Sequence, residues 1–408
     1  MASADQLIAN LQGVDAKSFA NEAERIRARD ALFEALRRIQ SPWDIAWDHV
    51  WVSGAINAAI KTLIDAGVFK KWAEAGGKPI TSTKLAELTG ADVLLIQRMM
   101  RAIAGQNLVT EVGLDTYART PWAVTLADDP PFASLYGGFY HELNNPMFRT
   151  LPEFIKENGF RNPTDGSRCN LQFWLKQPDT NLFQYIGNNE KLTSHFNDSM
   201  ECHSKYNLTP WVDVYPTETV VAAVKEGRPL VVDIGGGKGH DLKKFLARHG
   251  GNEEEGDNRK LPAGSLVLED LPEILKEVDV ASLSRGEITV RAHDFFTPQP
   301  DETRGARVYF MHDVLHDWPD EAAGRILRAL VPAMEKGYSR LLIHESLVSS
   351  ERPLGRVTVS DLTMMAALAA AERSEEQWRE LIASAGLRVV KIWRPVQSVE
   401  SIIEAEVA

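Results

Sequence analysis

The chain of 408 residues has few cysteines, no long apolar run and a deficit of positive charge. Its two cysteines, Cys169 and Cys202, are too few for a disulfide framework and fit a reducing compartment. The longest apolar run, at about residues 364–371, is far shorter than the roughly 20 residues of a membrane-spanning helix. Residues 1–14 lack the basic and apolar segments of a secretory signal. These absences predict a soluble, cytoplasmic protein that does not act at a membrane.

Positive charge is scarce because 45 Lys and Arg residues stand against 57 Asp and Glu residues, which gives a net charge of -12. An acidic chain repels phosphate backbones, so we expect no nucleic acid as the main partner. Hydrophobic residues make up 44% and charged residues 25%, as in ordinary globular domains. The length therefore predicts two or three folded domains.

The first half of the chain is predicted to be mainly helical and to contain a winged-helix module. A charged, periodic pattern predicts an exposed or partner-seeking helix over 20–38, and apolar residues at helical spacing predict a helix over 52–67. Two short helices, over 81–90 and 91–105, are followed by a two-stranded wing within 107–120. The second short helix, which would face DNA, is mostly apolar, so the module is interpreted as a packing or dimerisation module. A DNA-binding regulator is the weaker alternative.

From residue 229 onward, strands alternate with helices. The predicted strands cover residues 230–234, 265–269, 288–291, 307–311, 340–344, 388–393 and 402–407. This alternation predicts a parallel, doubly wound α/β sheet of the Rossmann-like kind. The last two strands have no helix between them and predict a terminal hairpin. We expect a helical dimerisation and winged-helix domain over 1–130, a helical linker and pocket region over 131–215 and an α/β domain over 216–408.

A glycine-rich turn and three carboxylates follow the first three strands of the α/β region. The turn, Asp233-Ile-Gly-Gly-Gly-Lys-Gly, allows the backbone to approach a ligand closely. His240 stands where a dinucleotide fingerprint needs its third glycine, which makes a nicotinamide dehydrogenase the weakest hypothesis. The next two strands lead to Asp270 and to Asp294 beside Phe295. Acids at three consecutive strand ends predict an adenosyl ligand, because a carboxylate there accepts ribose hydroxyls.

The fourth strand leads into two histidines, His312 and His316, four residues apart. Such a pair suggests a metal site, but no third ligand is evident and a loop is predicted there, so no metal is expected. A histidine in this place suits general base catalysis, because its pKa lies near neutrality. It equally suits a structural cap of the next helix. Composition alone leaves these two interpretations open.

Five motifs in a fixed order resemble the S-adenosylmethionine-dependent O-methyltransferases of the caffeate and flavonoid type, especially fungal enzymes of secondary-metabolite biosynthesis. They are Asp233-x-Gly-Gly-Gly-x-Gly, Asp270-Leu-Pro, Asp294-Phe-Phe, His316-Asp-Trp-x-Asp-Glu and Glu372-Arg-Ser-Glu-Glu-Gln-Trp. The resemblance covers nearly the whole chain. It implies S-adenosylmethionine as cofactor, a small phenolic or polyketide acceptor, and a homodimer joined through the N-terminal helices.

The resemblance also implies roles for individual residues. His316 would remove the phenol proton, flanked by Glu345, which follows the fifth predicted strand, and by Glu372. Residues implied to hold the cofactor are Asp233, Gly235, Gly237, Asp270, Asp294, Phe295 and Ser204, and those implied to contact the acceptor are Phe196, Asn197, Met200 and Asp317. Two positions depart from the pattern: His312 stands where many plant members have lysine, and Cys202 stands where an acid is usual.

A second hypothesis is a relative that binds S-adenosylmethionine but catalyses a pericyclic rearrangement or isomerisation without methyl transfer. Proteins of that kind typically lose the base histidine. This chain keeps His316, so the O-methyltransferase is the preferred prediction.

Overall fold

The computed structural model describes residues 3–207, 209–250, 261–276, 278, 283, 287–395 and 399–408. Its internal contacts divide the chain into two units. The N-terminal unit comprises Met1–Glu142 with Ser194–Cys202, and the C-terminal unit comprises Leu143–Thr193 with His203–Ala408. The region expected as a linker, residues 131–215, is therefore shared between the two units. A division of the chain at residues 130 and 215 stays a prediction.

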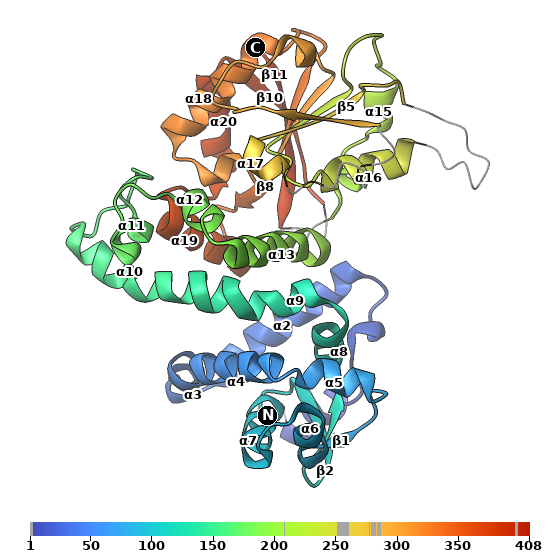
Figure 1. Cartoon of the computed structure of the whole chain (residues 1–408), viewed down its shortest axis with the longest axis vertical. Helices are drawn as coiled ribbons and strands as arrows, with labels where there is room; N and C mark the ends of the chain where they lie inside the picture. Colours follow the sequence, from blue (N-terminus) through green and yellow to red (C-terminus); the bar gives the residue numbers. More distant parts are fainter. Residues whose placement is uncertain are drawn as a thin grey trace. The chain divides into compact units, whose positions relative to one another are not determined.

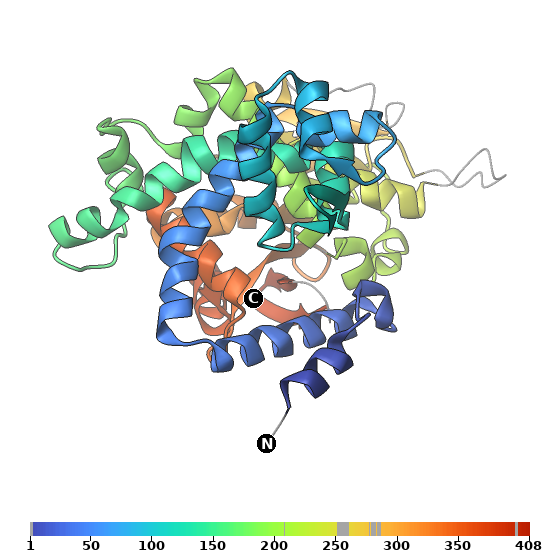
Figure 2. The same cartoon turned by 90° about the horizontal axis from the view of Figure 1, so that it is seen from below.

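The N-terminal unit consists of helices around a small sheet. Its elements are α1 (Ala4–Leu11), η1 (Ala16–Ser18), α2 (Glu22–Ile39), α3 (Pro42–Trp47), η2 (Asp48–Val52), α4 (Ser53–Asp65), α5 (Val68–Glu74), β1 (Ile80–Thr81), α6 (Ser82–Thr89), α7 (Val93–Ala104), β2 (Val109–Gly113), β3 (Thr116–Arg119), α8 (Pro121–Asp128) and α9 (Pro130–Ser134), and η3 (Leu135–Asn144) leads out of it. α3, η2 and α4 continue as one helical rod, which meets the end of α2 at a sharp angle (Figure 2). Ser41 caps this rod and Pro42 occupies its first helical position, where a missing N–H costs nothing.

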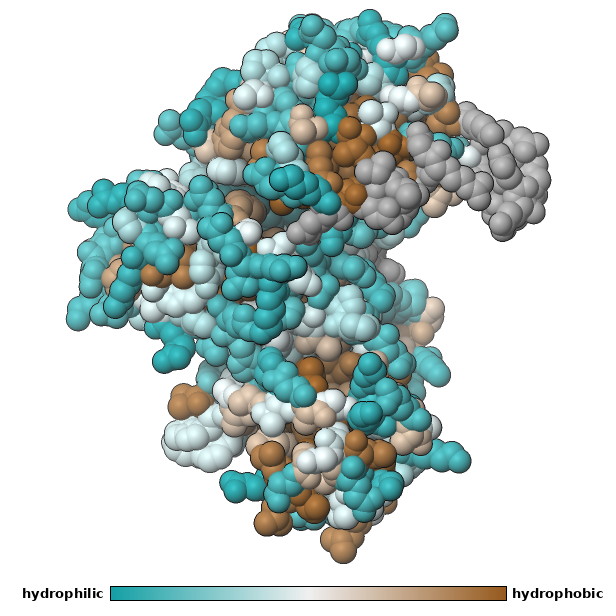
Figure 3. Space-filling view, in the orientation of Figure 1, coloured by the Kyte–Doolittle hydropathy of each residue, from teal (hydrophilic) through white to brown (hydrophobic). Residues whose placement is uncertain are grey.

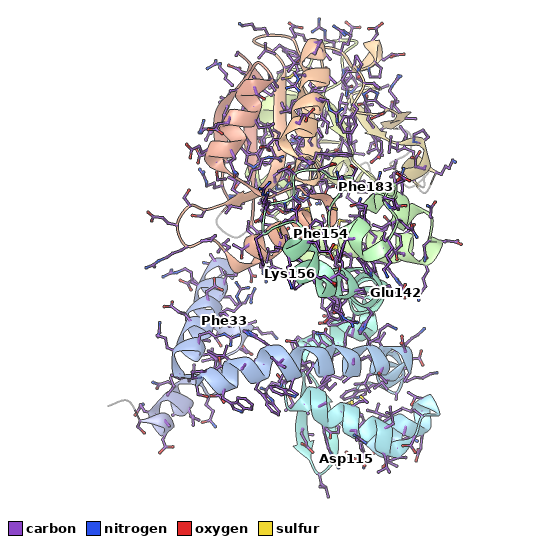
Figure 4. The ribbon with its side chains drawn as sticks, turned by 90° about the vertical axis from the view of Figure 1, so that its left-hand side faces the viewer. Phe33, Asp115, Glu142, Phe154, Lys156 and Phe183 are labelled. Atoms are coloured by element: carbon purple, nitrogen blue, oxygen red, sulfur yellow. The ribbon has the colours of Figure 1, made fainter. Side chains whose placement is uncertain are left out.

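The predicted winged-helix module is confirmed, with one more strand than expected. The side chain of Thr81 accepts a hydrogen bond from the N–H of Lys84 and caps α6, which ends at Gly90 with a left-handed φ of 73°. β2 and β3 form the wing, whose tip carries Asp115 (Figure 4), and the short β1 pairs with β3. α7 buries Ile96, Met100 and Ile103 in the core of this unit.

The C-terminal unit contains the α/β sheet. Its elements are α10 (Asn145–Glu157), α11 (Asn170–Leu175), α12 (Leu182–Gly187), α13 (Glu190–Asn207, shared with the N-terminal unit), α14 (Trp211–Val214), α15 (Glu218–Val221), β4 (Val231–Ile234), α16 (His240–His249), β5 (Leu266–Asp270), α17 (Pro272–Leu275), β6 (Ile288–Ala292), η5 (Asp301–Thr303), β7 (Val308–His312), η6 (Leu315–Asp317), α18 (Asp320–Leu330), η7 (Val331–Ala333), β8 (Arg340–Val348), α19 (Gly355–Leu368), β9 (Arg373–Ser374), α20 (Glu375–Ser384), β10 (Leu387–Trp393) and β11 (Glu400–Val407). All seven predicted strands are present.

The strand order is β10-β11-β8-β7-β4-β5-β6, with β9 paired to β8. β6, β5, β4, β7 and β8 are parallel, which confirms the doubly wound sheet. The terminal hairpin is also confirmed, and its second strand, β11, inserts between β8 and β10. The expected end of the fifth strand at residue 344 was wrong. Because pairing with β11 continues as far as Ser346, β8 extends to Val348 and Glu345 lies within the strand.

Two apolar cores cover the two faces of the sheet. α18 and α20 lie on one side and α16 on the other (Figure 1). On the α16 side, Trp211 is completely buried and stacks on Phe245, with ring centroids 5.5 Å apart, and its centroid lies 4.7 Å from that of Phe310. Its indole N–H donates to the carbonyl of Asp241 at 3.1 Å. Trp211 thus ties the start of α16 to the sheet and to α14.

Within the described ranges, no single helix is both long and apolar enough to cross a membrane. One bent pair, Pro42–Asp65 with Val68–Glu74, meets the length and composition criteria when its two helices are taken together.

Replacing Trp211 with Ala should lower the free energy of unfolding by about 3 to 5 kcal/mol. The change leaves a large cavity and removes the ring contacts with Phe245 and Phe310 and the hydrogen bond to Asp241. Urea denaturation followed by circular dichroism measures the change. Val390→Ala, at a strand position that is 45% exposed, should cost less than about 1 kcal/mol. Equal losses for the two variants would contradict the packing role of Trp211.

Candidate active site

Two consecutive residues of β8, His344 and Glu345, belong to different groups of ionisable side chains. Side chains alternate along a strand, so His344 shares a face with Leu342, in the α16-side core, and Glu345 shares the other face with Ile343. The His316 cluster comprises His316, Asp317, Glu345, Ser360 and Glu372, and the His312 cluster comprises His203, Asp241, His312, His344 and Glu400. Both clusters lie in the C-terminal unit.

His316 lies in η6, directly after β7, and its side chain is only 12% exposed. Its Nδ1 is 3.1 Å from Oε1 of Glu372 and 3.4 Å from Oε2 of Glu345. Its Nε2 is 3.5 Å from Oδ1 of Asp317. The structure therefore brings together four residues that the sequence analysis singled out. One ring nitrogen of His316 is held by a hydrogen bond to Glu372, while the other lies beyond hydrogen-bond distance of Asp317.

Glu345 also shapes the backbone that carries His316. Its Oε1 accepts hydrogen bonds from the N–H groups of Val314, Leu315 and His316, at 3.1, 2.8 and 3.3 Å. Asp313, just before these residues, has a left-handed φ of 52°, which turns the chain sharply out of β7. A fully buried carboxylate thus fixes the loop and faces the imidazole at the same time.

Arg373 binds the same loop from its other end, a role that the sequence analysis missed. Its guanidinium donates to the carbonyls of Leu315 and Trp318 at 2.8 and 2.6 Å and to Asp320 at 2.8 Å. The residue is 2% exposed and lies over the ring of Trp378, 5.1 Å from its centroid. The only signal for it was its place directly after Glu372 in the last motif.

Ser360, on α19, is a second residue that the sequence analysis missed. Its hydroxyl donates to Oε1 of Glu372 at 2.6 Å, the oxygen that also faces His316, and the carboxylate of Asp361 accepts from the backbone N–H of Glu372. Ser360 also lines a cleft of about 430 Å³ beside α19, together with His203, Ser346, Val357 and Val359 among others. No sequence motif marks Ser360, because only the fold brings α19 to Glu372.

Charge around His316 changes its protonation. Burial by itself lowers the pKa of His316, but the carboxylates of Glu345 and Asp317 and the hydrogen bond to Glu372 together raise that pKa well above its usual value. Burial raises the pKa of Asp317 to about 7, although His316 acts in the opposite direction. His316 is therefore a stronger base than a histidine in water.

The glycine turn after β4 leaves no room for a side chain at Gly235 or Gly236. Gly235 has a φ of 71°, and a Cβ there would lie 2.9 Å from Cγ2 of Val314 and 3.7 Å from the ring of Phe295. A Cβ on Gly236 would lie 2.5 Å from the carboxylate of Asp233. Both oxygens of that buried carboxylate have no hydrogen-bond partner among the described residues, and burial raises its pKa well above the usual value.

The other residues predicted for the cofactor surround this turn. Asp270, at the end of β5, accepts from the N–H of Gly237 at 2.8 Å and from its neighbour Leu271 at 2.7 Å. Asp294, after β6, accepts from the N–H of Phe296 and so fixes the turn that carries the Phe295 ring. A glycine cradle, an acid at the next strand end and a buried carboxylate beneath the turn fit an adenosyl cofactor with an amino-acid tail.

Ser204 accepts a hydrogen bond from Lys244 of α16 at 2.9 Å. Phe196, Asn197 and Met200 lie on the part of α13 that belongs to the N-terminal unit, where Phe196 packs near Phe139 with ring centroids 6.5 Å apart. Their predicted contact with an acceptor stays a prediction.

His312 and His316 belong to different groups of possible metal ligands, although they lie four residues apart and both have Asp313 within 4.0 Å. His312 ends β7 on the face of His344, and its ring lies 4.3 Å from the His344 ring. Its Nδ1 is 2.6 Å from Oδ2 of Asp241 and its Nε2 is 3.0 Å from Oε2 of Glu400. His312 thus lies between two carboxylates.

Comparison with known proteins agrees with this geometry. An O-methyltransferase domain model matches residues 160–388, and an O-methyltransferase dimerisation domain model matches residues 51–129. The O-methyltransferase mfmE of Annulohypoxylon moriforme is 34% identical over 400 residues, which cover 98% of this chain and 95% of that protein. A solved structure of LepI in complex with SAM has a TM-score of 0.85 at 25% identity and covers 99% of this chain and 98% of that one. A solved structure described as a pericyclic reaction enzyme has a TM-score of 0.84 at 25% identity, with the same coverage.

The chain belongs to the O-methyltransferase family that combines a Rossmann-like catalytic domain with an N-terminal dimerisation domain. It is a methyltransferase that uses S-adenosylmethionine as its cofactor. The predicted family, fold class and cofactor are confirmed.

Arg373→Lys should lower the free energy of unfolding by about 2 to 4 kcal/mol. The single ammonium group of a lysine cannot replace the planar guanidinium, which bonds to two backbone carbonyls and to Asp320 at once. Thermal and urea denaturation measure the loss. Arg379→Lys is the matched control, since Arg379 forms an exposed pair with Glu375 on α20. If both variants unfold alike, Arg373 does not hold the His316 loop.

Proposed function

We propose that this enzyme transfers the methyl group of S-adenosylmethionine to a phenolic hydroxyl of a small secondary metabolite, a polyketide or other aromatic compound, with His316 as the general base. The observation that carries the proposal is the tether of Nδ1 of His316 to Glu372, with Glu345 beside it. In the neutral form of His316, that tether directs the proton to Nδ1 and leaves a lone pair on Nε2 to accept the phenol proton.

The charges around His316 suit this proton transfer. A neutral phenol is a poor nucleophile with a pKa near 10, whereas a free histidine has a pKa of about 6.5, so transfer between them is uphill. The surrounding carboxylates raise the pKa of His316 and narrow this gap. Glu372 and Glu345 then stabilise the imidazolium, while Ser360 keeps Glu372 in place.

The cofactor supplies an activated methyl group on sulfur when it is bound. Residues that would hold it surround the glycine turn: Asp233, Gly235, Gly237, Asp270, Asp294, Phe295 and Ser204. Phe196, Asn197, Met200 and Asp317 would contact the acceptor. The protein's contribution is then to align the acceptor oxygen with the methyl group and to remove its proton.

We infer that the active form is a cytoplasmic homodimer that acts on a free small molecule, and not on nucleic acid or at a membrane. The dimerisation-domain match supports the dimer. Within the N-terminal unit, α1, α2 and α3 contribute no buried residue, and Trp43, Trp47 and Trp51 are each 46% to 62% exposed. Figure 3 shows apolar side chains on the surface of this unit. Burial of these side chains by a second copy would account for them.

A pericyclic or isomerase activity is the second candidate, and the similarity to solved structures of LepI and of a pericyclic reaction enzyme supports it. The intact contacts around His316 favour methyl transfer. A product that forms with the same mass as its substrate would favour the second candidate.

His316→Ala should lower the rate of methyl transfer by about 100- to 10,000-fold, the usual contribution of a general base. Transfer of label from methyl-labelled S-adenosylmethionine to a panel of phenols measures it. The affinity for S-adenosylmethionine, measured by calorimetry, should stay within about threefold, because His316 holds the acceptor proton and not the cofactor. A rate of methyl transfer close to that of the wild type in His316→Ala would contradict the mechanism.

Glu372→Gln should move the acid limb of the pH–rate profile to lower pH. Carboxylates raise the pKa of His316, so removal of one lowers that pKa and keeps the imidazole neutral to lower pH. In the wild type, the limb should lie above pH 6.5. Glu376→Gln, an exposed change on α20, is the control and should leave the limb in place. An unchanged limb in Glu372→Gln would show that another group sets it.

A further inference from the structure

The His312 cluster gathers around His344 of β8, whereas His316 contacts the next residue of that strand, Glu345, and the proposed methyl transfer does not use the His312 cluster. The carboxylate of Asp313 lies between the two groups, with Oδ2 at 3.7 Å from Nε2 of His312 and Oδ1 at 4.0 Å from Nε2 of His316. His312 ends β7, His344 lies beside it on β8, and Glu400 begins β11. His312 and His344 are register partners. Glu400 lies two residues before Ile402, the partner of His344 on β11, so all three side chains share one face. Neighbouring strands thus present two imidazoles and a carboxylate to one point.

The separations between these donor atoms suit a bound ion. Nε2 of His312 is 3.0 Å and Nε2 of His344 is 3.6 Å from the same oxygen, Oε2 of Glu400. One donor atom from each of the three residues lies within 4.8 Å of the others. Metal bonds of about 2.1 Å to nitrogen and oxygen place neighbouring donors about 3.0 to 3.4 Å apart. The two distances to Glu400, 3.0 and 3.6 Å, lie close to this range.

The outer contacts of the cluster resemble the second layer of a metal site. Oδ2 of Asp241 lies 2.6 Å from Nδ1 of His312. An ion bound at Nε2 would leave the proton of the His312 ring on Nδ1, where Asp241 accepts it. Asp241 is itself paired with Lys244. The second oxygen of Glu400, Oε1, is 2.8 Å from Nε2 of His203 on α13. Metal-binding histidines and carboxylates commonly have such outer partners.

A network of hydrogen bonds does not explain the buried ring of His344. It is 1% exposed, and neither ring nitrogen has a hydrogen-bond partner among the described residues. An unsatisfied buried polar group costs about 1 to 3 kcal/mol. A protonated His312 that donates to both Asp241 and Glu400 would account for His312 and still leave His344 unsatisfied. A ligand between His344 and Glu400 removes that cost.

We propose that His312, His344 and Glu400 bind a divalent transition-metal ion, with Asp241 and His203 as the outer residues that orient them. Two imidazoles and one carboxylate suit zinc-like ions better than Mg²⁺ or Ca²⁺, which prefer oxygen ligands alone. The ion also offsets the negative charge of Glu400 and Asp241, which are 1% and 11% exposed. It ties β7, β8 and β11 together next to the catalytic loop.

The sequence analysis expected no metal because no third ligand was evident near His312 and His316. The fold supplies the missing ligands from β8 and β11, far along the chain, whereas His316 contacts Glu345 and Glu372 instead. The ion proposed here takes no part in the proposed methyl transfer.

The test uses the full chain, stripped with a chelator and titrated with Zn²⁺ by calorimetry and with Co²⁺ by visible absorption. We expect one ion per chain, a Co²⁺ spectrum typical of four or five ligands, and a higher melting temperature with Zn²⁺. His344→Ala should weaken binding at least tenfold. His293→Ala, a histidine outside the cluster, is the matched control and should bind as the wild type does.

Asp241→Asn keeps the proposal testable if His344→Ala does not fold, and it should weaken binding about 10- to 100-fold while all three ligands remain. The proposal is overturned if the wild type binds no ion. It is equally overturned if both variants bind like the wild type, or if binding is lost in His316→Ala and kept in His344→Ala. Because the experiment measures metal binding, a negative result would not affect the proposed methyl transfer.

Discussion

The buried carboxylate of Glu345 is the interaction on which the arrangement of the active site depends. One of its oxygens accepts from three consecutive backbone N–H groups after β7, and the other faces Nδ1 of His316. Without this acceptor, three buried donors would lose their partner and the loop that carries His316 would lose its shape. Arg373 acts on the same loop from the carbonyl side, so donors and acceptors are both satisfied.

The extension of β8 beyond its expected end has a direct chemical consequence. His344 is the last residue of the expected strand and Glu345 is the first residue beyond it. Since side chains alternate, His344 goes to the His312 cluster and Glu345 goes to the His316 cluster. The same sheet edge therefore carries two groups of ionisable side chains with different partners. The His316 cluster orients a base, and the His312 cluster brings two imidazoles and a carboxylate close together.

The sequence predicts those parts of this structure that have a local signal. Each of the seven strands, the capped helices around Gly90 and the glycine turn after β4 follow from short patterns of apolar, capping and glycine residues. The resemblance to a family added His316, Glu345 and Glu372, which the fold brings together. Ser360, Arg373, His344 and Glu400 escaped notice because their importance arises from pairing between elements far apart in the chain. The end of β8 was misplaced for the same reason, since its partner β11 is the last strand.

The central claim is that His316 removes the proton of a phenol. The most direct test compares the rate of methyl transfer from S-adenosylmethionine to a series of phenols of graded acidity, with the wild type and with His316→Ala. The account predicts that the wild-type rate changes little along the series, whereas the variant methylates only phenols acidic enough to ionise in water. If both proteins show the same dependence on phenol acidity, His316 is not the base.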